Sequence, residues 1–549
     1  MRKATLVVAL VGAMGLAPVF TFAQGSAARG AIRLPGRTSA EHITSGQLRD
    51  YLSFIASDEL EGRDTPSRGL NTAAKFIATM LSRWGLSPAG DDGSFFQKIE
   101  LSRDVIVDEK ARLTLSGTAF AHGEGWFARP AAGAANAELV YVSHGWVNAT
   151  KNVDPYRGLD VKGKIVVAQL AFFPPGGSFQ DLRRGSTWTR PAAAAREHGA
   201  LAIVYVPTKR GFETWERLRT LLGTETLEPT KLRGPSEAEI PAAVAGMALT
   251  QAIFAGEKSD AESIWKGFDS GTPVEGFALT ASKTLALEVS TRSEVQWTQN
   301  VVAVWTGSDP VLKDQYVAFG AHYDHIGIND APGAEGDIIS NGADDDGSGT
   351  VALLAMAEAL ARTPRRPKRS VLFVWHCGEE KGLWGSEYFT DFPTIPLDRI
   401  VAQLNIDMIG RTRAAGDDNP RNAVLSGPHE VYAIGSKMMS DELGATSERV
   451  NDAYLKLQFN YKYDDPADPQ RLFYRSDHFN YAKKGIPIIF FFSGLHEDYH
   501  RVSDQVEKID FTKLQEVART IYVLGWQLAE SPTRPKVDRP LPATVVEAE

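Results

Sequence analysis

Short, nearly continuous apolar runs alternate with helix-like stretches in the C-terminal half of this chain. The runs cover residues 300–305, 316–322, 370–376, 400–406 and 486–492. Runs of this kind, rich in Val, Ile and Phe, are typical of strands buried on both faces of a sheet. Between them, Leu353, Leu354, Ala357 and Leu360 recur at helical spacing. The alternation predicts an α/β fold with a mostly parallel central sheet flanked by helices.

Two further helices are predicted between about residues 45 and 85. Leu48, Leu52 and Ile55 lie at helical spacing, and a second helical pattern follows a turn around Pro66. Because these patterns are amphipathic, each helix is expected to pack one face on a core. We assign residues 24–130 to the first part of the same domain as the strong C-terminal strands.

A smaller α/β domain is predicted in the middle of the chain. Residues 130–135 contain only Pro, Ala and Gly and read as a linker. Strand-like runs follow at 138–142, 164–168, 201–206 and 240–244, with a helix at 192–198. No cluster of catalytic residue types lies among them. We therefore expect an inserted domain at residues 131–285, a catalytic domain at 286–530 and a loose, proline-containing tail at 531–549.

The first residues have the pattern of a cleaved export signal. Arg2 and Lys3 precede an apolar run over residues 4–17, and small residues lead to Ala23. This predicts a signal peptide at residues 1–23 and a periplasmic or secreted protein, the alternative being an N-terminal membrane anchor. With the signal removed, no segment is expected to cross a membrane. The single cysteine, Cys377, excludes an internal disulfide.

Overall composition narrows the partners. The chain of 549 residues carries a formal net charge of −9 and a pI near 5.8. No basic stripe interleaved with aromatic residues is present, so a nucleic-acid partner is not expected. The length predicts more than one hydrophobic core. The oligomeric state cannot be derived from these features.

Polar residues of the kinds that bind metals follow several of the predicted strands. His322 ends one run, Glu379 and Glu380 follow the next, and Asp407 follows a third. His500 lies a few residues beyond the last run. In an open parallel sheet, ligands bind outside the carboxyl ends of the strands, so these side chains are expected to meet at one edge. Residues 342–349, Gly-Ala-Asp-Asp-Asp-Gly-Ser-Gly, add further carboxylates there.

Each of these features has a plainer explanation when taken alone. A lone histidine is more often a satisfied core residue, Asp344 to Asp346 alone suit a turn or a helix cap, and Glu379 and Glu380 alone suit a charged surface. Their conjunction at strand ends favours a metal site. Imidazole and carboxylate donors without thiolates suit zinc or another first-row divalent ion, and the carboxylate excess suits two ions. Asp324, two residues after His322, is placed to orient that imidazole.

The combined motifs resemble the M28 family of zinc peptidases. They are His322-Tyr-Asp324, Gly342-Ala-Asp-Asp-Asp-Gly-Ser-Gly349, Glu379-Glu380, Asn405-Ile-Asp407-Met-Ile-Gly410, Ser476-Asp477-His478 with Gly485-Ile-Pro487, and Asp498-Tyr-His500. The resemblance covers roughly residues 45–125 and 287–525. The segment between them resembles a protease-associated (PA) domain, which is commonly inserted in this family.

The resemblance implies a site with two Zn²⁺ ions. His322 and Asp407 would hold one ion, and Glu380 and His500 would hold the other. Asp344 would bridge both ions, and the peptide bond that follows it would be cis.

The same resemblance implies an exopeptidase, most simply an aminopeptidase that acts on peptides. A zinc-bound water would attack the peptide carbonyl, with Glu379 as general base. Tyr474 is the nearest candidate for a side chain that stabilises the oxyanion.

The sequence is also compatible with other functions. His496-Glu-Asp-Tyr-His500 matches the H-E-x-x-H motif, which in a zincin must lie on a helix with Glu497 as the base. A carboxypeptidase or a glutaminyl cyclase would use a related site. An inactive receptor-like binding protein with the same fold is the alternative outside enzymes. The residues do not fix the side-chain preference.

Overall fold

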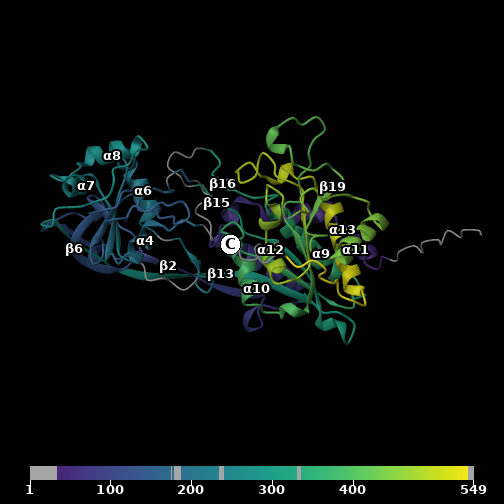
Figure 1. Ribbon diagram of the computed structural model, residues 1–549. Coiled ribbons are helices and arrows are strands. Elements are labelled where there is room, and N and C mark those ends of the chain that lie inside the picture. The colour runs from purple at the N-terminus through teal and green to yellow at the C-terminus, as the bar shows by residue number, and fades with distance from the viewer. Residues whose placement is uncertain are drawn as a thin grey trace, which may run out of the picture.

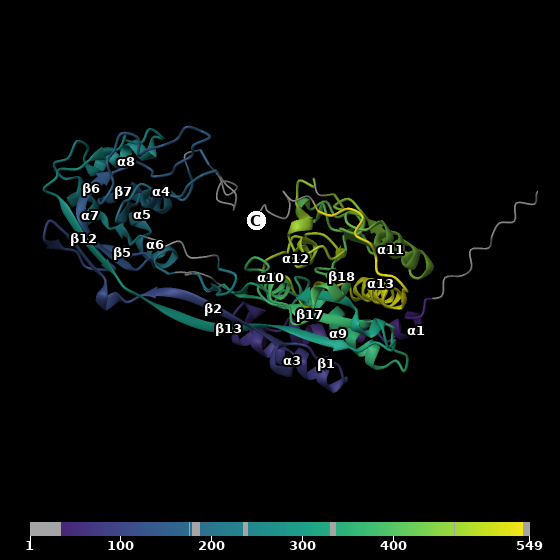
Figure 2. The same cartoon turned by 60° about the horizontal axis from the view of Figure 1, so that its bottom comes forward.

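The computed structural model describes residues 34–541 except 175, 178–186, 225, 234–239, 330–335 and 466. The expected signal peptide at residues 1–23 lies outside the described residues. The described chain forms two lobes, each built around its own sheet, and a long two-stranded ribbon runs from one to the other (Figures 1 and 2).

The larger lobe contains a mixed sheet. Its strands are β1 (Ser87–Pro88), β2 (Phe96–Ile106), β9 (Glu228–Pro229), β13 (Thr291–Trp305), β14 (Tyr316–His322), β17 (Ser370–His376), β18 (Ile400–Ile406), β19 (Glu430–Ile434), β20 (Gln458–Asn460) and β21 (Ile488–Phe492). They lie in the order β20-β19-β21-β18-β14-β17-β13-β2-β9, with β1 paired to β13. The central strands β21, β18, β14 and β17 are mutually parallel. On one side of them β13 pairs antiparallel with β17, and on the other side β19 pairs antiparallel with β21. The parallel sheet predicted from the sequence is therefore found at the centre and not at the edges.

Helices cover both faces of this sheet. One face carries α1 (Arg37–Ala40), α2 (Ser45–Ile55), α3 (Arg68–Arg83), α9 (Gly347–Ala361), α11 (Asp441–Ala453) and α13 (Phe511–Glu530), and the other carries α10 (Trp384–Asp391) and α12 (His478–Lys483). Alternate side chains of β14 join different cores: Phe319 packs toward the first group of helices and Ala318 toward the second. Burial on both faces explains why the central strands read as continuous apolar runs.

Helix α9 is buried along almost its whole length behind the central strands. Its residues from Gly347 to Leu360 are all buried, although the sequence suggested a single apolar stripe. The Asp346 side chain caps the helix by accepting a hydrogen bond from the Gly349 amide. A helix fixed on every side gives a rigid base for the aspartate-rich loop that precedes it.

The smaller lobe has a second sheet with parallel strands at its centre. Its strands are β3 (Arg112–Leu115), β4 (Thr118–Ala119), β5 (Trp126–Ala128), β6 (Gly133–Tyr141), β7 (Ile165–Gln169), β8 (Ala202–Val206), β10 (Ala242–Ala245), β11 (Phe277–Ala278) and β12 (Thr284–Val289). Its helices are α4 (Pro191–Glu197), α5 (Lys209–Glu213), α6 (Trp215–Leu222), α7 (Met247–Phe254) and α8 (Ala261–Asp269). The sheet extends beyond the expected limits of 131–285, because β3 to β5 and the end of β12 pair into it.

The β2–β13 ribbon links the lobes. The two strands pair antiparallel from Phe96 opposite Val301 to Ile106 opposite Thr291. The smaller lobe also returns β9 to pair with β2. The middle segment is therefore an insertion between two neighbouring strands of the larger sheet. Among the described helices, none combines the length and the apolar character needed to cross a membrane.

Candidate metal centre

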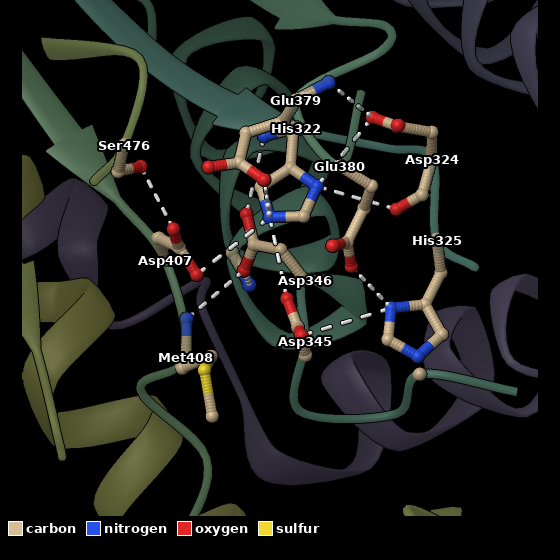
Figure 3. A network of polar contacts seen from close by, with 12 residues as sticks. His322, Asp324, His325, Asp345, Asp346, Glu379, Glu380, Asp407, Met408 and Ser476 are labelled. Carbon is tan, nitrogen blue, oxygen red and sulfur yellow. Dashed lines mark hydrogen bonds and ion pairs between the residues drawn. The ribbon is translucent and has the colours of Figure 1, made fainter. Parts of the chain in front are cut away.

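The carboxyl ends of the central parallel strands bring the polar side chains to one edge of the larger sheet. His322 is the last residue of β14, Glu379 and Glu380 follow β17, and Asp407 follows β18. His500 lies in the loop after β21. Figure 3 shows the first four of these side chains converging with those of the loop before α9. The chain thus assembles imidazoles and carboxylates from five separate segments in one place.

One group of ligand atoms surrounds the His322 ring. Its Nε2 lies 3.4 Å from Oδ1 of Asp345 and 3.7 Å from Oδ1 of Asp407. Oε2 of Glu379 is 3.9 Å from the same nitrogen. We refer to His322, Asp345 and Asp407 as the Asp407 group; its three members can hold one metal ion together.

A second group lies on the other side of Asp345. Nε2 of His500 is 3.2 Å from Oδ2 of Asp345 and 3.0 Å from Oε2 of Glu380. We refer to Asp345, Glu380 and His500 as the Glu380 group. The two groups share Asp345, which presents Oδ1 to one and Oδ2 to the other.

The residue between the two groups is Asp345, not Asp344 as expected from the sequence. Oδ1 of Asp344 accepts a hydrogen bond from the Gly410 amide at 2.6 Å, and its Oδ2 lies 3.3 Å from Nε2 of His496. The cis peptide bond correspondingly joins Asp345 to Asp346, one position later than expected. The assignment of the bridging role to Asp344 is therefore corrected by one residue.

The three consecutive aspartates contact three different partners, which explains why the shared residue is Asp345 and not Asp344. Asp344 turns toward His496, Asp345 faces the two groups, and Asp346 caps α9. Oδ1 of Asp346 also accepts from the Met408 amide at 3.1 Å, and its Oδ2 accepts from the His322 amide at 3.2 Å. Asp504 fixes the loop by accepting from the amides of Asp344 and Asp345.

The electrostatics of the two groups call for positive charge. Burial raises the pKa of Glu379 well above its ordinary value, with a further contribution from Glu380. Burial also raises the pKa of Asp407. Burial lowers the pKa of His322, but the negative charges of Glu379 and Asp407 raise this pKa well above its ordinary value.

The unsatisfied atoms of the site fit a bound cation. Oδ2 of Asp345, Oε1 of Glu380 and Oδ1 of Asp407 are buried and have no hydrogen-bond partner among the described residues. The nearby Arg63 donates to the carbonyls of Tyr323 and Gly342 and not to these oxygens. Buried carboxylates without a partner are costly, and nitrogen and oxygen donors at these distances suit zinc.

Neighbouring hydrogen bonds fix the orientation of the site's side chains. Nδ1 of His322 lies 3.2 Å from the carbonyl oxygen of Asp324 and 3.5 Å from its Oδ1. The same Oδ1 accepts from the Glu379 amide at 3.2 Å. Ser476 donates to Oδ2 of Asp407 at 2.7 Å, which leaves Oδ1 to face His322. Such partners typically set the tautomer and direction of metal-binding groups.

Two hollows adjoin the groups. One is lined by the polar residues Asp345, Glu379, Asp407, Arg475 and Tyr499 and by the apolar residues Met408, Leu472, Phe490, Phe492 and Leu495. The other is an open cleft whose lining includes Glu379, Glu380, Glu387, Tyr474 and Arg475. Tyr474 lines the open cleft, whereas Tyr499, which was not singled out from the sequence, lines the hollow that contains Asp345.

The H-E-x-x-H motif does not form a zincin site. Residues 497–500 form a turn and not a helix. His496 faces Asp344, while His500 faces Asp345 and Glu380. Glu497 accepts a hydrogen bond from Asn419 at an exposed position. The two histidines therefore do not share a face, which the zincin arrangement requires.

Comparison with known proteins agrees with this geometry. Residues 300–524, which contain every member of both groups, match the model of Peptidase family M28. This part of the chain, somewhat less than half of its length, is therefore similar to the M28 peptidases. The M28 match leaves the smaller lobe unassigned, so its likeness to a PA domain stays a prediction.

The curated proteins that resemble this chain are distant from it. A probable zinc metalloprotease of Pyrenophora tritici-repentis is 27% identical over 267 residues, covering 43% of this chain and 53% of its own. Leucine aminopeptidase 2 of Arthroderma otae is 25% identical over 297 residues, covering 49% and 53%. The chain thus spans about half the length of the curated relatives it matches. Among solved structures, an aminopeptidase from Aneurinibacillus sp. strain AM-1 is 17% identical with a TM-score of 0.49, covering 92% of this chain and 97% of its own.

Proposed function

We propose that this chain is an exported aminopeptidase with two zinc ions, one at the Asp407 group and one at the Glu380 group. The observation that carries the proposal is Asp345, whose two carboxylate oxygens face two separate sets of imidazole and carboxylate donors. A shared carboxylate between two donor sets is what a pair of cations needs. The similarity of residues 300–524 to Peptidase family M28, together with the names of the curated relatives, supports a peptidase.

Glu379 is the proposed general base. It lies 3.9 Å from the His322 ring and lines both hollows. When bound, the cations would polarise the peptide carbonyl and make water a stronger acid. The position of Glu379 beside the Asp407 group suits a carboxylate that accepts a proton from water and passes it to the leaving amine.

The hollows suggest which end of a peptide binds. The open cleft presents the carboxylates of Glu379, Glu380 and Glu387, which favour a positively charged α-amino group. The other hollow has apolar walls that include Leu472, Phe490 and Leu495. We therefore propose that the N-terminal end of a peptide binds in the open cleft. Tyr474 lines the open cleft and Tyr499 the other hollow, and we retain Tyr474 as the proposed oxyanion partner.

Arg475 favours a second candidate function. Its guanidinium lines both hollows and is the kind of group that binds a C-terminal carboxylate, as a carboxypeptidase requires. The carboxylates on the cleft wall outnumber it, so we place the aminopeptidase first.

A panel of matched peptides tests the proposal. The zinc-loaded protein is given Leu-containing peptides with free ends, with an acetylated N-terminus, or with an amidated C-terminus. We expect hydrolysis of the free and amidated peptides and none of the acetylated one. Cleavage of the acetylated peptide together with loss of the amidated one would instead identify a carboxypeptidase. No hydrolysis of any peptide by a protein with two bound ions would favour the binding-protein alternative.

The remaining parts of the proposal concern the whole chain. We propose that residues 1–23 direct export and are removed, and that the smaller lobe is a PA-like domain inserted in the peptidase. The insertion between β2 and β13 supports that arrangement. Mass spectrometry of the protein secreted from an expression host, with an N-terminus at residue 24, would support the signal assignment.

A further inference from the structure

His325 is a buried histidine at the site that the proposed function leaves unused. It follows β14 by three residues, its side chain is 0% exposed, and Figure 3 shows its ring directed at Glu380 and Asp345. Its position is fixed tightly, because a Cβ added at Gly342 would lie 2.5 Å from Cγ of His325. A buried imidazole held so firmly beside carboxylates requires a partner.

The contact between His325 and Glu380 is short and buried. Nδ1 lies 2.8 Å from Oε1 of Glu380 and 3.7 Å from Oδ2 of Asp345. Yet Nδ1 and Oε1 both lack a hydrogen-bond partner among the described residues. The two atoms are close but not aligned as donor and acceptor. A buried imidazole nitrogen and carboxylate oxygen at this distance suit a shared metal ion as well as each other.

The distances resemble those between two ligands of one zinc ion. With metal–ligand lengths of about 2.0–2.1 Å and tetrahedral angles, ligand atoms lie about 3.3 Å apart. His500 stands 3.0 Å and 3.2 Å from the Glu380 and Asp345 oxygens it faces. The corresponding His325 distances, 2.8 Å and 3.7 Å, bracket the same value. The two rings approach nearly perpendicular, with an interplanar angle of 72°.

We propose that Nδ1 of His325 is a fourth protein ligand of the cation held by the Glu380 group. This inference rests on the proposed function, since it assigns a ligand to one of its two ions. That ion would then have His325, His500, Glu380 and Asp345 as ligands. Ligand atoms of His325, Asp345 and Glu380 all lie within 4.8 Å of one another.

The additional ligand distinguishes the two groups. Four protein ligands close a tetrahedral zinc site, whereas a catalytic site keeps an open position. The Asp407 group supplies only three, and Glu379 lies beside it. The Glu380 group would then hold its ion with one protein ligand more than the Asp407 group, and Glu379 lies on the Asp407 side.

Cobalt binding tests the assignment on the full chain without any substrate. The metal-free protein is titrated with Co²⁺ while metal content and visible and near-ultraviolet absorption are recorded. The variants are His325→Gln, which removes the ligand, and His325→Cys, which replaces it with a thiolate. His42→Gln, at an exposed position, is the control. Circular dichroism checks that each variant is folded.

Loss of a residue that only supports a metal ligand typically lowers metal affinity by about 10- to 100-fold. We expect His325→Gln to weaken the binding of one of the two cobalt ions by more than this. His42→Gln should bind as the parent protein does. His325→Cys should bind two ions and gain a thiolate-to-cobalt absorption band. The parent protein, which carries the buried Cys377, should lack that band.

Parent-like affinity for both ions in His325→Gln would overturn the assignment. So would a His325→Cys protein that holds two cobalt ions without the new band. Failure of the proposed function would look different: the parent protein would bind two ions and hydrolyse no peptide, or would bind none at all.

Discussion

At the scale of single residues, the site depends on which of three adjacent aspartates faces the metals. Asp345 contributes one oxygen to each group, while Asp344 is engaged with the Gly410 amide and His496. Both carboxylates are buried, so burial alone does not distinguish them. The distinction is geometric and can be tested with matched substitutions.

Asp345→Asn is expected to abolish the shared ligand. An amide cannot bridge two cations as a carboxylate does, so the variant should retain at most one tightly bound zinc and lose nearly all activity. Asp344→Asn is the control, and it should keep two zinc ions while losing roughly 1–3 kcal/mol of unfolding free energy. Metal analysis and thermal unfolding measure both effects. Two zinc ions in Asp345→Asn and fewer in Asp344→Asn would restore the assignment made from sequence.

Glu379→Gln is expected to leave the metals in place and to lower kcat by roughly 10²–10⁴-fold, because the general base is lost. Glu497→Gln, at the exposed glutamate of the H-E-x-x-H motif, should keep parent-like kcat and KM. Steady-state kinetics on one Leu-containing peptide compares the two. An inactive Glu497→Gln beside an active Glu379→Gln would favour the zincin reading instead.

Residue types and strand ends were enough to predict the neighbourhood of the site, but not its internal assignment. His322, Glu379, Glu380, Asp407 and His500 converge because each follows a strand or its loop at the same edge. The choice of Asp345 over Asp344 depends on backbone torsions in a loop with no periodic pattern. His325 was overlooked because a lone histidine after a strand carries no signal without its spatial partners.

At the scale of secondary-structure elements, the turn before α9 sets the site. Gly342 has a φ of +55°, and a Cβ there would lie 2.2 Å from the carbonyl oxygen of Asp345. The turn therefore has room only for glycine. Arg63 stabilises the turn by donating hydrogen bonds to the carbonyl oxygens of Asn341 and Gly342. The helix that follows is fixed by burial on all sides.

Gly342→Ala is expected to displace both Asp345 and His325. The variant should lose metal affinity and unfold at a lower temperature, because the added methyl meets backbone and ring atoms. Gly46→Ala is the matched control: Gly46 lies in α2 with open space around it, and alanine there should stabilise by about 0.5–1 kcal/mol. Calorimetry with and without zinc measures both. Unchanged zinc affinity in Gly342→Ala would show that the turn does not position the site.

Sequence periodicity predicted the central elements closely and the outer ones less well. β14, β17 and β18 have the bounds expected from their apolar runs, because strands buried on both faces carry an unmistakable pattern. β13 begins at Thr291, earlier than the expected residue 300, since its first half lies in the ribbon and includes exposed polar residues. The antiparallel flanks could not be predicted, because pairing direction leaves little trace in composition.

At the scale of the whole molecule, the two lobes meet through the β2–β13 ribbon. Figure 2 shows the ribbon running out of the larger sheet toward the smaller one. Ile106 and Thr291 are register partners where the ribbon reaches the smaller lobe. Ile106 and Thr291 are therefore close enough for a short turn to join the two strands.

Deleting residues 107–290 and joining Ile106 to Thr291 by Asn-Gly is expected to give a folded peptidase, since this dipeptide suits a two-residue hairpin. If the smaller lobe limits the access of long peptides to the site, hydrolysis of short peptides should persist in this variant and hydrolysis of long ones should rise. The ratio of the two rates, compared with the full chain, is the measurement. An unchanged ratio in a stable, active deletion variant would argue against such a role.

The central claim is that two cations share Asp345. Diffraction from crystals of the zinc-loaded protein, recorded on both sides of the zinc absorption edge, locates the metals directly. The account predicts two anomalous peaks about 3.5–4 Å apart, one beside His322 and Asp407 and one beside Glu380 and His500, with Asp345 between them. A single peak, or a pair centred on Asp344 and His496, would contradict it.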